Sequence, residues 1–409
     1  MNTVLFLTSA YPYFPGEQFI EDEIGYWAGQ ISTKIVIVPM TASGVPRNTP
    51  EGIEVDLTLA HRVSLVGKLK SAFAAIISNI FWKEVRFIYA SKGLEFRCYL
   101  QALRSVSNVM RIEKSLTHIH AKYENPNIAY CYWNDAQAYA AVLLKRAGLI
   151  SKIISRAHGF DIYESRRPNG YMPLKRQFIG EIDSILAISN EGKTYLEMTY
   201  NALPHQVLVT PLGVPIPRLI ASVSEPGYLN IVSISFCVPV KRIDKIIDAI
   251  AEAALQLQSL KITWTHIGDG PLLTNLKLRA AEKLTLRQVE WSFLGNKPNY
   301  EVKQYFEKNT VDIFINASES EGVPVSIMEA MSYGVPVIAP NVGGIGELVS
   351  DEYSCLLVEN PSITDIAAAI KRMVSKGKKP EIRILAKKKI ITNYSAVCNY
   401  KKVVKLIIN

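Results

Sequence analysis

The sequence lacks clustered cysteines, long uncharged apolar runs and low-complexity tracts. Its five cysteines are dispersed and include no C-x-x-C pair, which argues against both a disulfide framework and a zinc site. We expect them to be buried free thiols in a reducing compartment. No segment reaches the roughly 18 uncharged apolar residues of a membrane-spanning helix, and the first residues carry no basic stretch typical of a signal peptide. These absences favour a cytoplasmic protein.

Acidic residues are also fewer than basic ones: the sequence has 37 acidic and 46 basic residues, which gives a net charge of +9. Such a charge draws a protein to phosphates, nucleic acids or anionic membranes. No helix-turn-helix, RNA-binding aromatic pair or zinc module supports a nucleic-acid ligand. The chain of 409 residues is 48% hydrophobic and 20% charged, which predicts a folded protein of two domains.

Short β-branched apolar runs alternate with longer amphipathic stretches along the chain. This alternation is typical of parallel strands joined by crossover helices. The predicted strands cover residues 4–8, 34–38, 128–132, 153–155, 184–188, 229–233, 262–267, 290–293, 311–316 and 335–338. The predicted helices cover residues 19–30, 135–147, 190–198, 241–257, 272–284, 300–307 and 326–332. The predicted fold class is therefore α/β, with two tandem Rossmann-like doubly wound domains.

Proline and glycine cluster at residues 210–217, which marks a domain boundary. We predict an N-terminal Rossmann-like domain at 1–212 and a C-terminal Rossmann-like domain at 213–390. A C-terminal helix at 391–409 is expected to pack back toward the N-terminal domain. Ligands of such sheets bind beyond the carboxyl ends of the strands, so we expect the two domains to face each other across a cleft that holds the site.

The richest motif runs from Glu321 to Glu329, where a predicted strand is followed by a Gly/Pro loop and a short helix. A loop that leads into a helix N-terminus offers backbone N–H groups and partial positive charge to a diphosphate. Glu321 lies in the loop and Glu329 on the helix, and a carboxylate suits the paired hydroxyls of a ribose. The alternative interpretation is a capped helix that carries two solvated glutamates.

This motif, with the segment that follows it to residue 349, resembles the E-x7-E region of family 4 glycosyltransferases, which are retaining enzymes with the two-domain GT-B fold. Matching motifs occur in order over most of the chain: His158-Gly159-Phe160-Asp161, Leu212-Gly213-Val214, Lys241-Arg242-Ile243-Asp244, His266-Ile267-Gly268-Asp269-Gly270-Pro271 and Phe293-Leu294-Gly295. The resemblance implies that the domain at 1–212 binds the acceptor and that the domain at 213–390 binds the nucleotide-sugar donor. Within the second domain, Glu329 is implied to hold the nucleotide ribose and Glu321 to contact the transferred sugar. The resemblance also implies contacts to sugar and phosphates from the loop residues Val323, Pro324, Val325 and Ser326.

One departure from the family pattern lies at the start of the second domain. The family carries an arginine and a lysine there that grip the diphosphate; Lys241 matches the lysine, whereas Phe236 stands in place of the arginine. Cations at this point favour the transition state, because the leaving diphosphate gains charge. We expect Arg242 to substitute for the missing arginine. The alternative is that Lys241 and Arg242 only begin a solvated helix, although positive charge is disfavoured there.

A histidine and two glycines complete the expected site. His158 follows a predicted strand, and the resemblance implies that it contacts the donor sugar near the reacting carbon. Gly16, after the first strand, is expected to allow close backbone approach to the donor. Gly268 belongs to one of the matching motifs on the donor side, and Asp161 is a candidate for orienting the His158 loop. The segment 132–135 fits either an acceptor groove or core packing.

Two basic segments leave a choice open. Residues 61–97 mix large apolar side chains with Lys68, Lys70, Lys83, Arg86, Lys92 and Arg97. They fit either a helical pair packed on the first sheet or a basic, hydrophobic face that lies on an anionic membrane. Residues 371–389 carry nine basic residues against one acid, Glu381, and fit either an addition to that face or a solvated exterior.

Together these features predict transfer of a hexose-type sugar from a nucleoside diphosphate sugar to an acceptor hydroxyl, with retention. The expected acceptor is a polyprenyl-diphosphate-linked oligosaccharide, or another glycan, in bacterial O-antigen, capsule or exopolysaccharide synthesis. No D-x-D motif is present, so we expect neither a metal nor a cofactor. We expect a cytoplasmic protein that binds peripherally to the inner face of the cell membrane. Two alternatives stay open: a nucleotide-sugar epimerase, and a non-catalytic sugar-nucleotide-binding protein.

Overall fold

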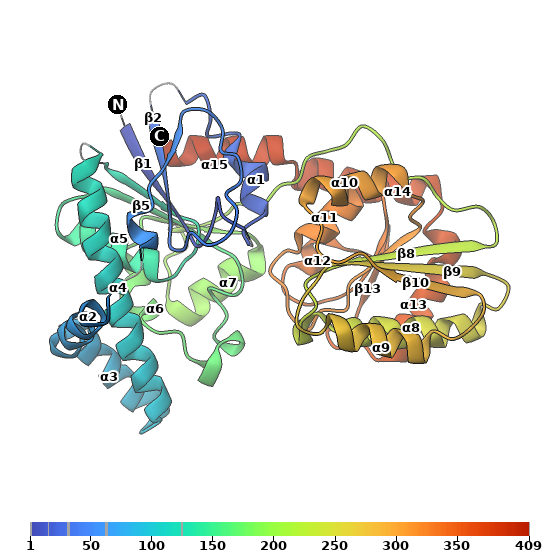
Figure 1. Ribbon diagram of the computed structural model, residues 1–409, viewed down its shortest axis with the longest axis horizontal. Coiled ribbons are helices and arrows are strands. Elements are labelled where there is room, and N and C mark those ends of the chain that lie inside the picture. Colours follow the sequence, from blue (N-terminus) through green and yellow to red (C-terminus); the bar gives the residue numbers. More distant parts are fainter. Residues whose placement is uncertain (1, 15, 31–32, 62–63, 124–125, 409) are drawn as a thin grey trace. The chain divides into compact units, whose positions relative to one another are not determined.

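The computed structural model describes the chain except for residues 1, 15, 31–32, 62–63, 124–125 and 409 (Figure 1). The chain divides into two compact units: unit 1 holds Met1–Thr210 and Tyr400–Asn409, and unit 2 holds Pro211–Asn399. It therefore passes between the units twice, at residues 210–211 and inside the last helix, α15 (Ala396–Ile408).

The predicted C-terminal helix is present as α15 and joins unit 1 from Tyr400 onward, but it does not begin at residue 391. Residues 391–393 end α14 (Pro380–Asn393), and α15 begins only at Ala396. The helix breaks because Val214 pairs with the backbone on both sides of the gap: its N–H donates to Tyr394 O at 2.9 Å, and its carbonyl accepts from Ala396 N at 3.0 Å.

Unit 1 is a seven-stranded sheet with helices on both faces. The strands, β1 (Asn2–Thr8), β2 (Thr33–Pro39), β3 (Ile53–Val55), β4 (Ile128–Cys131), β5 (Lys152–Ala157), β6 (Ser184–Ala187) and β7 (Val207–Val209), are all parallel and lie in the order β3-β2-β1-β4-β5-β6-β7. The helices are α1 (Phe19–Ile24), α2 (Leu65–Ile77), α3 (Asn79–Lys92), α4 (Phe96–Lys122), α5 (Ala136–Arg146), α6 (Lys175–Phe178), α7 (Asn190–Tyr200) and the end of α15.

Unit 2 repeats this architecture with six parallel strands. Their order is β10-β9-β8-β11-β12-β13, made of β8 (Tyr228–Ile234), β9 (Lys261–Ile267), β10 (Val289–Phe293), β11 (Ile313–Ile315), β12 (Val337–Pro340) and β13 (Cys355–Leu357). The helices are α8 (Ile243–Gln256), α9 (Leu273–Lys283), α10 (Asn299–Lys308), α11 (Val325–Ser332), α12 (Ile345–Leu348), α13 (Ile363–Lys376) and α14. The predicted α/β class with two doubly wound parallel sheets is confirmed.

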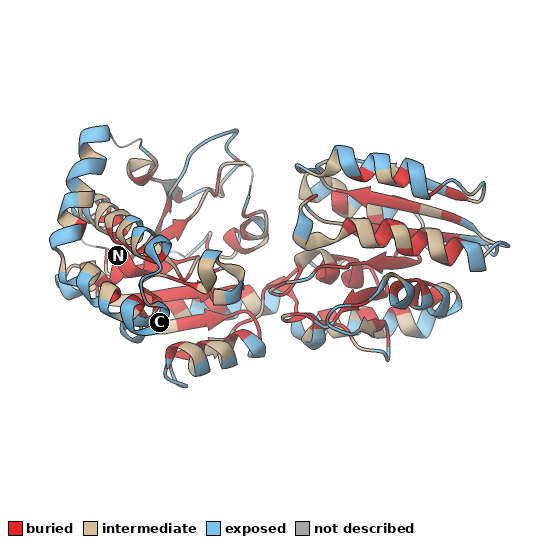
Figure 2. Ribbon diagram, turned by 90° about the horizontal axis from the view of Figure 1, so that it is seen from below, coloured by how far each residue is buried: buried red, intermediate tan, exposed pale blue. Residues whose placement is uncertain are grey.

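The cores follow from strand alternation, which sends successive side chains to opposite faces. In β1, Leu5 and Leu7 join the core under α4 and α5, whereas Val4 and Phe6 join the core under α1 and α15. Both faces of β1 are covered, so residues 4–7 form a continuous apolar run. Figure 2 shows the result, with buried strands between helices whose outer faces are exposed.

Two helix predictions differ from the structure in ways that matter for the site. The helix predicted at 19–30 ends at Ile24, because Gly25 begins a turn that leads to Gly29 at a φ of +82°. The helix predicted at 241–257 begins at Ile243, because Arg242 lies in the left-handed region at a φ of +48°. Lys241 instead ends a short 3-10 turn, Pro239–Lys241.

The cysteine prediction is confirmed for four of the five thiols. Cys98, Cys131, Cys237 and Cys355 are buried and free, whereas Cys398 is exposed on α15. No single helix among the described residues meets the length and apolarity of a membrane span. By length and composition alone, α2 and α3 meet that test together, with a bend of 64° between them.

A buried ion pair ties α1 to the strands of unit 1. Glu23 and Arg156 are both fully buried, with 3.4 Å between Oε2 and Nη2. The Glu23 carboxylate also accepts hydrogen bonds from the hydroxyls of Tyr130, at 3.0 Å, and Tyr132, at 3.1 Å. A buried charge is tolerated only when partners surround it in this way.

We expect Glu23→Ala to lower the free energy of unfolding by about 3–5 kcal/mol, because it leaves the Arg156 charge buried without its counterion. Glu54→Ala is the matched control, since Glu54 pairs with Lys34 at 2.8 Å on the exposed surface. That change should cost at most about 1 kcal/mol. Urea denaturation measures both, and equal losses in the two variants would contradict the role given to the buried pair.

Candidate functional site

The predicted donor residues of unit 2 gather at one edge of its sheet. The strands are parallel, so the loops that follow β8, β9, β10, β11 and β12 all leave from the same side. Backbone hydrogen bonds join these loops: Cys237 N donates to Asp269 O at 2.8 Å and Glu319 N donates to Val240 O at 2.9 Å. The edge is therefore a connected surface of loops.

Glu321 is held at the centre of this edge. Its carboxylate accepts from Lys241 Nζ at 2.6 Å and from Asn316 Nδ2 at 3.2 Å. Glu321 is only 9% exposed, so the alternative of a solvated glutamate is wrong. Lys241 and Glu321 were both predicted at the site, and the structure brings them into direct contact. Asn316 was missed, although its place at the end of a predicted strand is a usable signal.

Glu329 projects from α11 and is also buried. Asn299 Nδ2, from the first residue of α10, donates to Glu329 Oε1 at 2.5 Å. The loop residues Val323 and Pro324 lead into α11, and Val325 and Ser326 form its first turn. The N-terminus of α11 therefore falls between Glu321 and Glu329 along the chain. A helix N-terminus carries the positive end of the helix dipole and favours a bound anion.

Arg242 lies beside this group but points to other acids. Its guanidinium pairs with Glu319 through Nη1, and its Nε lies 3.5 Å from Asp244. Phe236, at the place of the family arginine, is 58% exposed and so does not belong to the core. Arg242 thus brings a cation to the same edge of the sheet as Lys241.

Two glycines allow the loops to approach one another. A Cβ at Gly268 would lie 1.9 Å from Ser235 O, and a Cβ at Gly343 would lie 2.0 Å from Glu321 O. Gly344 N donates to Gly322 O at 2.7 Å beside the second contact. Gly343, which also has a φ of +55°, therefore sets the position of the Glu321 backbone.

His158 directly follows β5 at the corresponding edge of unit 1. Three rings surround it, those of Trp133, Tyr132 and Phe19, with centroid distances of 4.5, 5.3 and 5.7 Å. His158 is buried, and its Nδ1 lies 3.6 Å from Asp161 Oδ2, which is too long for a hydrogen bond. Its Nε2 has no hydrogen-bond partner among the described residues. Buried polar atoms are normally satisfied, so Nε2 points to a ligand or water.

Asp161 orients the loop that carries His158. Its carboxylate accepts from His158 N at 2.8 Å and from Asn134 N at 2.9 Å, and thereby joins the loops that follow β5 and β4. Burial alone would raise the pKa of Asp161, but interactions with His158, Lys175 and Asn134 lower it to about 2. The carboxylate therefore stays ionised, which suits a positioning role.

A buried lysine lies beneath these loops, and sequence reasoning missed it. Lys175 is fully buried and donates through Nζ to both the backbone and the side-chain oxygen of Asn134. Burial lowers its pKa to about 8. Burial and the charge of Asp161 raise the pKa of Asp135 to about 6. No sequence signal marks Lys175, because it follows a left-handed residue, Leu174, in an irregular segment.

Two further predicted features lie in the loops that follow β1 and β4. A Cβ added at Gly16 would meet no described atom within 4 Å, so within the protein it is the φ of +113° that favours glycine, and close approach to a donor stays a prediction. The preceding Pro15 lies outside the described residues. In the segment 132–135, Tyr132 is a core residue, whereas Trp133 is only half-buried and lies against His158.

The basic segment 371–389 is largely engaged within unit 2. Lys376 donates to Ser354 O at 3.1 Å, Lys378 to Tyr228 O at 2.7 Å and Lys387 to Pro217 O at 2.6 Å. Arg383 is buried and donates to Ala221 O at 2.7 Å. These cations bind backbone carbonyls, so of the two alternatives the addition to a free basic face does not hold for them.

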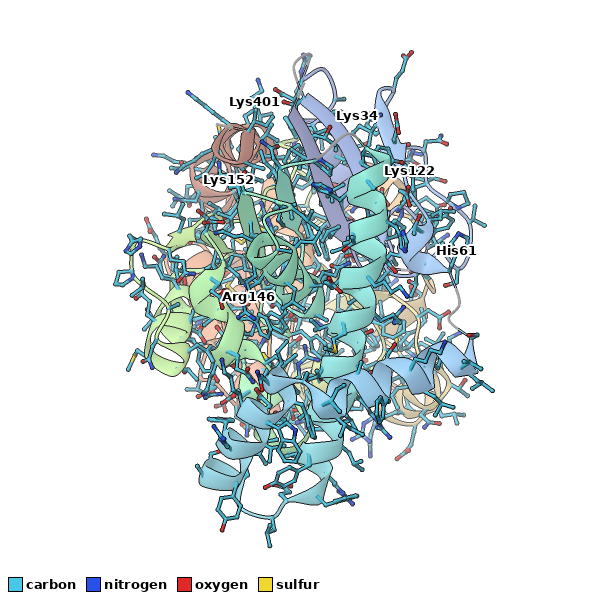
Figure 3. All side chains as sticks on the ribbon, turned by 90° about the vertical axis from the view of Figure 1, so that its left-hand side faces the viewer. Lys34, His61, Lys122, Arg146, Lys152 and Lys401 are labelled. Carbon is cyan, nitrogen blue, oxygen red and sulfur yellow. The ribbon has the colours of Figure 1, made fainter. Side chains whose placement is uncertain are left out.

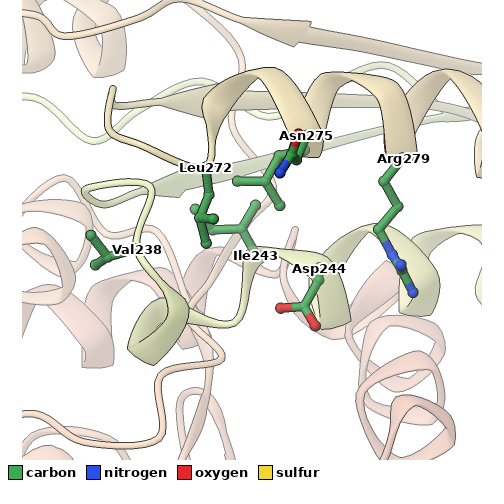
Figure 4. Close-up of a pocket in the computed structure, with 7 residues that line it drawn as sticks. Val238, Ile243, Asp244, Leu272, Asn275 and Arg279 are labelled. Carbon is green, nitrogen blue, oxygen red and sulfur yellow. The ribbon is translucent and has the colours of Figure 1, made fainter.

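A separate cavity of about 190 Å³ lies between α8 and α9 (Figure 4). Its lining includes Val238, Ile243, Asp244, Leu272, Asn275 and Arg279 and contains none of the predicted site residues. Among the described residues, no group of three or more His, Cys, Asp or Glu side chains is arranged to hold a metal ion.

Comparisons with known proteins agree with this picture. Residues 221–390 match the family described as glycosyl transferases group 1. A protein of Salmonella typhimurium strain LT2, named as the colanic acid biosynthesis glycosyltransferase WcaL, is 29% identical over 266 residues, which are 62% of this chain and 64% of that protein. The chain thus spans less than two thirds of this relative's length.

Two solved structures resemble the whole chain. The apo form of the lipopolysaccharide outer core galactosyltransferase WaaB has a TM-score of 0.69 at 18% identity, with 99% of both chains covered. Anabaena Alr3699/HepE in complex with UDP and glucose has a TM-score of 0.66 at 14% identity, also with 99% of both chains covered. The likeness shows the fold, which is of the GT-B type.

We expect Gly343→Ala to lower the free energy of unfolding by more than Gly227→Ala. Gly227 also has a positive φ, +89°, but no described atom lies within 4 Å of its added Cβ. The φ alone should cost each variant about 1–2 kcal/mol, whereas the clash with Glu321 O should add about 1–3 kcal/mol. Chemical denaturation measures the difference, and equal costs would contradict the tight contact.

Proposed function

From the glycosyl transferases group 1 domain that residues 221–390 form, we infer that the chain is a glycosyltransferase. We propose that it moves a hexose-type residue from a nucleoside diphosphate sugar to an acceptor hydroxyl with retention. The observation that carries this proposal is the ion pair between Lys241 and the buried carboxylate of Glu321, inside the matched segment that also holds Glu329 on α11. The fold neighbour that binds UDP and glucose supports a donor of this class.

In this proposal, Lys241 and Arg242 neutralise the diphosphate as it leaves. Both now pair with carboxylates, Glu321 and Glu319, which fix the two cations in place before a ligand arrives. Fixed cations favour the transition state because the leaving group gains charge during transfer. These cations supply charge that a metal ion would otherwise provide, so we propose transfer without a metal.

The remaining residues divide the donor between them. Glu329 is proposed to accept hydrogen bonds from the ribose hydroxyls. Glu321 is proposed to accept hydrogen bonds from the hydroxyls of the transferred sugar. The first turn of α11, with Val325 and Ser326, faces the phosphates in this proposal, where the helix dipole favours negative charge. His158 is proposed to contact the sugar, which supplies a partner for its Nε2.

We propose a lipid-linked glycan of bacterial surface polysaccharide synthesis as the acceptor, and an anionic membrane as the surface where the chain meets it. Support comes from α2, whose exposed apolar residues recur at helical spacing: Leu65, Leu69, Phe73, Ile76 and Ile77. Ala75 on the same helix is buried. The other face of the helix therefore packs inward, and the apolar row is free to insert.

Charge on α2 and α3 suits the same surface. Lys68, Lys70, Lys83, Arg86, Lys92 and Arg97 are all exposed. Across residues 64–97 the acids are Glu84, which is buried, and Glu95. Figure 3 shows Lys34, Lys122 and Arg146 elsewhere on unit 1, and these three pair with Glu54, Asp56 and Glu181. Six exposed cations between residues 68 and 97 are thus accompanied by one exposed acid, Glu95, and this excess of positive charge favours anionic lipid.

We expect Glu329→Ala and Lys241→Ala to lower the turnover number by about 10²–10³-fold, since each removes one preorganised electrostatic contact. Lys245→Ala is the control, because Lys245 donates to Pro361 O at 2.9 Å away from the site. Sugar transfer from UDP-sugars to a polyprenyl-diphosphate glycan measures the effect, with folding checked by thermal unfolding. Unchanged turnover would refute the site, and an epimer formed without acceptor would favour the epimerase alternative.

Arg242→Ala should weaken UDP binding by roughly tenfold, the size of one charge-assisted contact of about 1.4 kcal/mol. Arg279→Ala is the matched control, since Arg279 pairs with Asp248 at 2.5 Å on α8. Isothermal titration with UDP measures both. An unaltered affinity in Arg242→Ala would show that Arg242 does not replace the family arginine that Phe236 displaces.

The membrane proposal predicts that the protein sediments with phosphatidylglycerol vesicles and that added salt weakens the binding. The double change Phe73→Ser and Ile77→Ser should weaken it at least about tenfold, because each exposed apolar side chain contributes about 1.5–3 kcal/mol when buried. Leu255→Ser with Leu278→Ser, exposed on α8 and α9, is the control. Indifference to anionic vesicles would defeat the proposal.

A further inference from the structure

Glu17, which follows β1 in unit 1, holds an unusual set of partners. Its Oε1 accepts from Ser9 N at 2.9 Å, and its Oε2 accepts from Ala10 N and Tyr11 N, both at 2.6 Å. Oε1 also accepts from Trp133 Nε1 at 2.6 Å. Four N–H groups from two separate loops thus converge on one buried carboxylate.

Only an ionised carboxylate satisfies these partners. Three are backbone N–H groups and the fourth is an indole N–H, and none of them can accept a hydrogen bond. A glutamine would direct its own NH₂ group at these donors and leave at least one of them unsatisfied. Glu17 also adopts a φ of +50°, which is unfavourable for a residue with a Cβ. The strain is offset by charge-assisted hydrogen bonds.

These contacts lead to His158. Trp133, which donates to Glu17, lies with its ring centroid 4.5 Å from that of His158. Phe19, two residues after Glu17, lies 5.7 Å from the same imidazole and stacks on Tyr132 at 5.6 Å. The segment from Glu17 to Phe19 therefore reaches the His158 ring by two routes, one through Trp133 and one directly.

Successive backbone N–H groups in a loop form a nest that binds anions. In this chain the nest of Ser9, Ala10 and Tyr11 is filled by a side chain of the chain itself. The loop is consequently ordered before any ligand binds, and its order needs no ligand phosphate. Asp161 does the same for the loop of His158 itself.

We propose that Glu17 is a positioning residue: its carboxylate fixes the loop after β1 and, through Trp133, the orientation of the His158 ring. The predicted effect of Glu17 on activity rests on the proposed function. The predicted effect of Glu17 on the Trp133 indole does not depend on activity. Glu17 holds groups of unit 1, whereas Lys241 and Glu329 belong to unit 2. We therefore expect its loss to alter the reaction step and to leave nucleotide binding unchanged.

The test compares Glu17→Gln with Glu21→Gln in the full-length protein. Glu21 is four residues away and pairs with Arg47 at 2.7 Å, so the control makes the same chemical change nearby. We expect Glu17→Gln to lower kcat by about 10–100-fold, since small misplacements near a reacting centre cost that much. KM for the UDP-sugar and the affinity for UDP should stay within about twofold of wild type, as should every value for Glu21→Gln.

Two readouts separate this inference from the proposed function. The indole N–H resonance of Trp133 should shift in Glu17→Gln and stay in place in Glu21→Gln, whether or not the protein transfers sugar. Trp133→Phe, which keeps a ring but removes the indole donor, should lower kcat by a smaller factor and serves if Glu17→Gln fails to fold. A wild-type kcat in both Glu17→Gln and Trp133→Phe would overturn the positioning role, and so would an unmoved indole resonance in Glu17→Gln.

Discussion

Buried carboxylates that accept several hydrogen bonds are the constraint on which the loops of this protein depend. Removing an ionised carboxylate from water is costly unless donors replace the lost hydration. Glu17 and Asp161 meet that requirement with backbone N–H groups, and Glu321 meets it with Lys241 and Asn316. Each carboxylate therefore recruits groups from two loops, and the loops at the carboxyl ends of the strands are fixed together.

The same interaction also works away from the site. Asp312, which precedes β11 and is fully buried, accepts from Ser224 N at 2.9 Å and from Asn230 N at 2.8 Å. It thus holds the entry to unit 2 against the first residues of β8. Loops without regular structure of their own become rigid by this means, and rigid loops are what a preorganised site requires.

Most strands were predictable because they are largely apolar, and even the three-residue β11 was found because all three of its residues are buried. The equally short β3, β7 and β13 each have only one buried residue and were missed. The start of α8 was misplaced because nothing in the sequence marks Arg242 as left-handed. At the site, Lys241, Glu321, Glu329 and His158 carry motif signals. The partners Asn299 and Lys175 carry none, because contacts between residues about 30 or more positions apart depend on the assembled sheet.

The last helix has a consequence for how the chain acquires its structure during synthesis. Val403, Val404 and Ile407 of α15 complete the core on the α1 face of unit 1, and the Tyr400 ring lies 5.9 Å from the Arg156 guanidinium. Unit 1 is therefore interrupted by the whole of unit 2. While the ribosome translates residues 211–399, α1 alone covers this face of the nascent N-terminal sheet, and the part that α15 will cover stays exposed to chaperones and to aggregation.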